Sequence, residues 1–225
     1  MSGRDIIPCV DWYAVRCVFR LSPPVDRYVE RIALWQAESF VDAIAAAEPD
    51  AEQRAEREGL EYLGFADAFR THQMHHDHPD HGDEVFSLLR DSKLAPEPYL
   101  DTFFTAGGAG PLSDPDHAGD GWYAVRRVVL WSERDSYEER ITLWRAASAA
   151  AAVHDSAVES RQYAVELVGD GVDLGLAQCH HLGPDRPSHG DEIFAYARTS
   201  RLAPPEYLDA FFDTGEERAD DLGAD

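Results

Sequence analysis

Several short stretches of this chain are mainly apolar and are predicted to be β-strands, in which successive side chains point to opposite faces. In residues 28–35 the even-numbered side chains share one face and the odd-numbered side chains share the other. Other stretches are rich in aromatic and β-branched residues, which favour strands. We therefore expect strands over 12–20, 28–35, 60–70 and 85–90, with counterparts over 122–131 and 193–198.

A helix is expected after the second strand, because apolar residues recur there at the spacing of one buried helical face. Ser39 is a suitable N-cap. Pro49 has no N–H to donate, so we expect it to break or kink this helix. The alanine-rich segment from Ser148 predicts the corresponding helix later in the chain, and 98–104 and 206–212 predict two short helices.

The chain repeats its own motifs at an offset of about 105 to 110 residues. "WYAVR" occurs twice, "YVERIALWQA" returns as "YEERITLWRA", "HGDE" recurs, and "LAPEPYLDTFF" returns as "LAPPEYLDAFF". Between the copies lies "TAGGAGPLSDPDHAGDG", whose Gly, Pro, Ser and Asp content is that of a linker. The predicted organisation is a first repeat over 1–104, a linker over 105–121, a second repeat over 122–212 and an acidic tail over 213–225.

These elements predict an α+β fold of two tandem ββαββ units with antiparallel sheets, related by a pseudo-twofold axis. Each unit is followed by a short C-terminal helix. A single four-stranded sheet with one helix leaves one sheet face open, so the twin unit or a partner is expected to cover that face.

The order of "WYAVR", "ERI", helix, third strand and "GDE" before the fourth strand resembles a bacterial domain-of-unknown-function family, number 4288. Both repeats match, at about 12–90 and 122–198, so the resemblance covers most of the chain. The histidine-rich approach to the fourth strand and the appended "LAP..YLD.FF" segment depart from the family pattern. The resemblance implies the fold above, and it implies no activity and no catalytic residue.

The formal net charge of −23 is the strongest feature of the composition. It argues against binding to nucleic acid or to an anionic membrane, because both need a basic face. Basic proteins and cations are the partners that such a field attracts, although acidity also serves solubility. No signal-like or membrane-length apolar segment is present, and the three cysteines lack CxxC spacing. We expect a soluble, cytoplasmic protein.

The segment "HQMHHDHPDHGDE" and its counterpart "CHHLGPDRPSHGDE" suggest a metal site, since imidazoles and carboxylates bind transition ions. The candidate ligands are His75, His76, His81, Asp83, His180, His181, His189 and Asp191. Adjacent histidines in a strand would point to opposite faces, which disfavours one shared ion. A solvated loop in which "HGDE" forms a turn is the other interpretation, and it predicts no cofactor.

Aromatic and arginine side chains on the strands offer a second candidate site. A ligand cleft between the repeats could be lined by Trp12, Trp35, Arg31, Trp122, Trp144 and Arg140. The tryptophans could equally form the core, and the two arginines could form cross-strand ion pairs.

No Walker, GxSxG or HExxH motif is present. We therefore expect a non-catalytic acidic binding protein that recognises a protein partner, as an inhibitor or an immunity-like module would. The alternative is a small-molecule-binding protein or enzyme with a cleft between the repeats, with a divalent transition metal at the histidines.

Overall fold

The computed structural model describes residues 10–21, 27–71, 78–104, 110–111, 119–166, 171–211 and 217–218. In the first half of the chain the elements are β1 (Asp11–Leu21), β2 (Arg27–Ala37), α1 (Phe40–Glu58), β3 (Leu60–Arg70), β4 (Glu84–Asp91), α2 (Pro96–Tyr99), the π-helical turn η1 (Leu100–Phe104) and β5 (Gly110–Pro111). In the second half they are β6 (Gly121–Trp131), the 3-10 turn η3 (Ser132–Arg134), β7 (Ser136–Ala146), α3 (Ala149–Glu166), β8 (Gly171–Gly183), β9 (Glu192–Thr199), α4 (Pro204–Phe211) and β10 (Glu217–Arg218).

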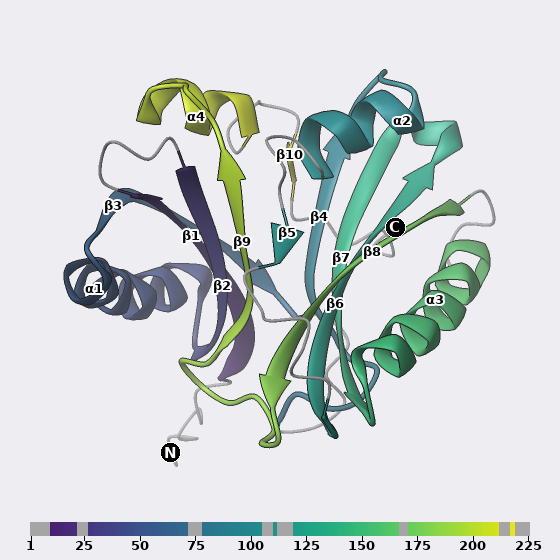
Figure 1. The fold of residues 1–225 in the computed structure, drawn as a ribbon, viewed down its shortest axis with the longest axis horizontal. Coiled ribbons are helices and arrows are strands. Elements are labelled where there is room, and N and C mark those ends of the chain that lie inside the picture. The colour runs from purple at the N-terminus through teal and green to yellow at the C-terminus, as the bar shows by residue number, and fades with distance from the viewer. Residues whose placement is uncertain are drawn as a thin grey trace, which may run out of the picture.

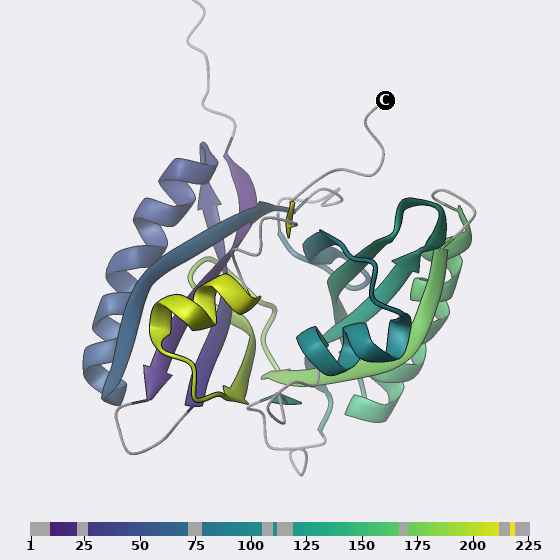
Figure 2. The same ribbon diagram turned by 90° about the horizontal axis from the view of Figure 1, so that it is seen from above.

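The fold is mixed α+β, with two antiparallel sheets that pack face to face between two outer helices (Figure 1). Seen from above, the order of the layers is α1, first sheet, second sheet, α3 (Figure 2). One apolar cluster contains side chains from the inner faces of both sheets, including Trp12, Leu34, Trp122 and Leu143. Each sheet therefore covers the inner face of the other.

The fourth long strand of each half lies in the sheet of the other half. The strand orders are β3-β1-β2-β9-β5 and β10-β4-β7-β6-β8. β9 pairs antiparallel with β2, and β4 pairs antiparallel with β7. The expected order of two strands, a helix and two strands occurs along each half, but neither half builds a four-stranded sheet from its own strands.

Turns before β4 and β9 bring these strands into the opposite sheet. The N–H of Gly82 donates to the carbonyl of Leu143 at 2.7 Å, and the N–H of Leu143 donates to the carbonyl of Asp83 at 2.9 Å. Gly190, Leu34 and Asp191 make the same pair of bonds at the other crossing. The glycines have φ of +87° and +83°, a region that side chains disfavour.

Buried ion pairs also join the exchanged strands to their new sheets. Arg198 of β9 bonds to Glu30 of β2 at 2.6 Å, and Arg90 of β4 bonds to Glu139 of β7 at 2.9 Å. Arg126 of β6 is a second partner of Glu139. All of these side chains are almost fully buried, so neither charge can be exposed without separating the strands.

Two tyrosine stacks hold the C-terminal helices against the same sheets. Tyr99 lies on Tyr137, and Tyr207 lies on Tyr28, each with ring centroids 3.7 Å apart. Because α2 follows β4 and α4 follows β9, each short helix packs on the sheet that its preceding strand has joined.

Helix α1 begins at the expected place, since the Ser39 side chain accepts the N–H of Asp42. The helix is capped at its other end by Gly59, which has a left-handed conformation. The expectation that Pro49 breaks this helix is wrong, because α1 continues through it to Glu58. Its buried face consists of alanines spaced four apart, which allows close approach to the sheet.

Candidate functional site

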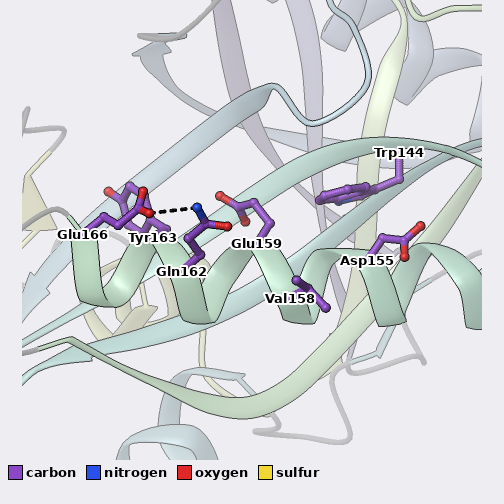
Figure 3. A pocket seen from close by; sticks show the side chains of 7 residues that line it. All are labelled: Trp144, Asp155, Val158, Glu159, Gln162, Tyr163 and Glu166. Carbon is purple, nitrogen blue, oxygen red and sulfur yellow. Dashed lines mark hydrogen bonds between the residues drawn. The ribbon is translucent and has the colours of Figure 1, made fainter.

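A cavity of about 610 Å³ lies along one flank of α3, beside β7. We call it the α3 groove (Figure 3). Its lining residues are Trp144, Asp155, Val158, Glu159, Gln162, Tyr163 and Glu166. All but Trp144 come from α3, and at about 100° per residue they fall on one side of the helix.

The floor of the α3 groove is a buried polar network centred on Glu138. Its carboxylate accepts hydrogen bonds from Ser87 at 2.7 Å, from the Trp131 indole at 2.9 Å and from the Tyr163 hydroxyl at 3.0 Å. The Arg140 guanidinium lies on the Tyr163 ring, 3.4 Å from its centroid. Tyr163 thus connects the groove surface to this interior network.

Arg140 is already paired with carboxylates. It bonds to Glu84 through Nε and to Glu159 through Nη2 at 3.0 Å. Among the described residues, the groove lining and the polar network beneath it therefore contribute five carboxyl groups, those of Glu84, Glu138, Asp155, Glu159 and Glu166. The same set contains one guanidinium, so the α3 groove is strongly acidic.

Burial raises the pKa of Glu138, and the nearby Glu84 charge raises it further, against the effect of Arg140. Burial and the Glu138 charge also raise the pKa of Tyr163, so its hydroxyl remains a proton donor to the carboxylate. For Arg140, burial lowers the pKa, but the surrounding carboxylates outweigh burial and raise it. Arg140 thus remains charged and paired with its carboxylates.

Both halves of the chain contribute to this network. Ser87 and Glu84 belong to β4, which comes from the first half, whereas Glu138, Arg140 and Tyr163 belong to the second half. The strand exchange is therefore required for the groove floor to be complete.

The corresponding flank of α1 is closed. The cavity there is only about 20 Å³, and Arg54 extends across it to Glu192 at 3.0 Å. In the paired motifs "YVERI" and "YEERI", Val29 occupies the position of Glu138. In the paired helices, Arg54 occupies the position of Tyr163. These differences are sequence signals that distinguish the two sites. The motifs and spacings of the sequence did not mark Glu138 or Tyr163 as site residues.

The structure does not bring the four predicted cleft tryptophans together. Trp12 and Trp122 lie between the sheets in one buried cluster. Trp35 and Trp144 lie on the outer sheet faces in two other clusters. The space expected to form a cleft between the halves is filled by the core, and of these four only Trp144 lines the α3 groove.

The two predicted arginines also lie on outer faces, each beside its own helix. Arg31 bonds to Glu58 and Glu192, both at 2.6 Å. Arg140 makes the contacts given above. Both arginines are thus in ion pairs with a helix and with an exchanged strand.

His81 and His189 occupy matching structural positions. His81 packs edge-on against Trp144 with ring centroids 5.0 Å apart, and its Nδ1 accepts the backbone N–H of Arg145 at 3.1 Å. His189 makes the same contacts with Trp35, at 5.1 Å, and with a backbone N–H of β2, at 3.0 Å. In each histidine one ring nitrogen is therefore occupied by the fold.

The aspartates of the two "HGDE" motifs stabilise the turns themselves. Asp83 accepts the backbone N–H of Asp80 at 2.7 Å, and Asp191 accepts that of Ser188 at 2.8 Å. These bonds are typical of Asp in tight turns.

His180 and His181 lie next to each other in β8 and point to opposite faces, as the strand period requires. His180 contacts Phe194 in the inter-sheet region, and His181 contacts Tyr123. Burial lowers the pKa of His180. The candidates His75 and His76 fall outside the described residues.

Within the described ranges, no group of three or more His, Cys, Asp or Glu side chains is arranged to hold a metal ion. In that same part of the chain, no helix has both the length and the apolar character needed to cross a bilayer.

Comparisons of the chain with protein-family models, with curated proteins and with solved structures gave no match.

Proposed function

We propose that this protein is a non-catalytic binding module that recognises a basic segment of a partner protein in the α3 groove. The observation that carries the proposal is the groove itself, an open cavity of about 610 Å³. Among the described residues around it, the carboxylates outnumber one guanidinium that is already paired. Asp155 and Glu166 are exposed at its rim and available to a cation.

The charge of the whole chain supports the same partner chemistry. A net charge of −23 accelerates encounter with a basic protein, and the effect weakens as salt screens the field. An inhibitor or immunity-like role in the cytoplasm, against a basic effector, is the form of binding that suits such a charge.

A binding role accounts for the buried carboxyl better than a catalytic role does. Glu138 has a raised pKa, which is a property of acid–base residues, but its side chain is only 3 % exposed and already accepts three hydrogen bonds. A group in this position supports Tyr163 and Arg140 beneath a ligand and does not reach one.

We also infer that the two halves are copies of one ββαββ unit related by a pseudo-twofold axis, as in a duplicated relative of domain-of-unknown-function family 4288. Matching contacts support this inference, since the Tyr28–Tyr207 stack has its counterpart in Tyr99–Tyr137. On this view the copies diverged at one flank, where the second copy has Glu138 and Tyr163 in the places of Val29 and Arg54.

The test is a binding titration of the full chain with a short poly-arginine peptide, followed by tryptophan fluorescence. The groove variant is Asp155→Asn/Glu166→Gln, and the matched control is Glu52→Gln/Glu56→Gln, which removes the same charge from exposed positions on α1. We expect affinity to fall about tenfold in the groove variant and less than about twofold in the control. Equal losses in both variants would show that net charge alone attracts the peptide and would refute the proposal.

A further inference from the structure

We infer that the occupant of the α3 groove is an extended peptide segment with basic side chains at alternate positions. This inference rests on the proposed function and adds the conformation and spacing of the ligand.

The acceptors of the groove lie in a line along α3. Asp155 is followed by Glu159, Gln162 and Glu166 at four, seven and eleven residues, which places them on one stripe of the helix. At a rise of 1.5 Å per residue they lie at about 0, 6, 10.5 and 16.5 Å along the axis.

An extended chain matches this spacing. Alternate residues of a strand point to one side and lie about 6.7 Å apart, so three of them fall at about 0, 6.7 and 13.4 Å. The first two positions face Asp155 and Glu159. The third falls between Gln162 and Glu166, which are hydrogen-bonded to each other at 2.8 Å and both present acceptor oxygens.

Basic residues four apart on a helical ligand would also repeat at about 6 Å, so spacing alone does not distinguish it from an extended ligand. The dimensions of the groove do distinguish the two. A cavity of about 610 Å³ spread over that length of about 16.5 Å has a mean cross-section of about 40 Å². A helix about 10 Å wide needs roughly twice that area. One strand in a packed sheet occupies about 4.8 by 10 Å, which is much closer to the cross-section of the groove than that of a helix.

The groove walls suit the stems of long basic side chains. Val158 is about half exposed on the rim, and the indole of Trp144 closes one end beside Asp155 (Figure 3). Methylene stems can lie on these apolar surfaces while the charged heads reach the carboxylates. Glu159 already binds Arg140, but a carboxylate has further acceptor sites for a second cation.

The test uses two short peptides of identical composition, each with three arginines. In one the arginines alternate with alanine, and in the other they are consecutive. Both are titrated into the full chain by calorimetry, in parallel with the Asp155→Asn/Glu166→Gln and Glu52→Gln/Glu56→Gln variants and with spermine. We expect the alternating peptide to bind about five- to tenfold more tightly than the consecutive one. This preference is lost in the groove variant and kept in the α1 control.

The outcomes separate the two proposals. Equal binding of both peptides that still depends on Asp155 and Glu166 would refute the extended ligand and leave the binding function intact. Spermine binding more tightly than either peptide would also refute it, in favour of a small polyamine. If neither peptide's affinity responds to the groove substitutions, the proposed function fails and this inference fails with it.

Discussion

Replacing Glu139 with Gln tests whether the buried charges hold the exchanged strand in place. Glu139 lies on β7, and its carboxylate bonds to Arg90 of β4 at 2.9 Å and to Arg126 of β6. The Glu139 side chain is 5 % exposed. Glutamine keeps the shape and removes the charge, so both arginines remain buried without their carboxylate partner.

The magnitude follows from the pKa of this carboxyl. Burial by itself raises the pKa of Glu139, but the charges of Arg126 and Arg90 outweigh burial and lower this pKa from 4.5 to about 2. A group with a lowered pKa stabilises the fold above its unfolded pKa and loses that contribution as the pH falls. At about 1.36 kcal/mol per pKa unit, Glu139 contributes about 3 kcal/mol at pH 6 and about 1.4 kcal/mol at pH 3.

The assay is urea unfolding of the wild-type chain and of Glu139→Gln between pH 6 and pH 3. We expect the variant to be less stable by about 3 kcal/mol at pH 6, with the difference falling by about half at pH 3. Glu56→Gln is the control, because Glu56 is exposed on α1, and its effect should stay below about 0.5 kcal/mol. A difference that stays constant over this pH range, or one below about 1 kcal/mol at pH 6, would refute the assigned charge state.

Three further predictions concern close packing, a thiol and a histidine. A Cβ on Gly121 would lie 2.6 Å from the His181 ring and 2.7 Å from a backbone oxygen. Gly121→Ala should therefore lower the melting temperature by several degrees. Gly119→Ala is the control, because a Cβ there meets nothing within 4 Å, and it should leave the melting temperature unchanged. Burial raises the pKa of Cys17 to about 12. In a variant whose other two cysteines are replaced by serine, the Cys17 thiol should therefore react slowly with a thiol reagent at pH 8 until urea unfolds the protein. Rapid reaction of the folded chain would contradict this. His189→Ala should lower the free energy of unfolding by about 1 to 2 kcal/mol in urea titrations, because it removes ring packing on Trp35 and a hydrogen bond. The loss should be the same with and without added Zn²⁺. A zinc-dependent difference would restore the metal interpretation.

Local features of the fold could be predicted because they depend on neighbouring residues in the chain. The period of the strand at 28–35 gives the two faces of β2, and Ser39 begins α1 as a capping residue should. The prediction that Pro49 breaks the helix failed for a tertiary reason, since packing of the alanine face against the first sheet maintains a helix that local propensity disfavours.

The candidate site depended much less on sequence pattern. The histidine-rich segment attracts attention by composition, whereas the polar network beneath the α3 groove is centred on Glu138, which stands in the place of Val29 in a repeated motif. The role of Glu138 follows from its hydrogen bonds to Tyr163 and to Ser87, which lies on a strand of the other half. Neither contact is visible as a spacing along the chain.

The sequence by itself determined the strands, the helices, their order and the similarity of the two halves. Only the tertiary structure decided which sheet β4 and β9 join. β2 and β7 have nearly the same sequence, so a fourth strand finds similar partners in either sheet, including an aligned glutamate at Glu30 or Glu139. The choice depends on non-local terms, namely the crossing turns at Gly82 and Gly190 and the burial of both inner sheet faces in one shared core.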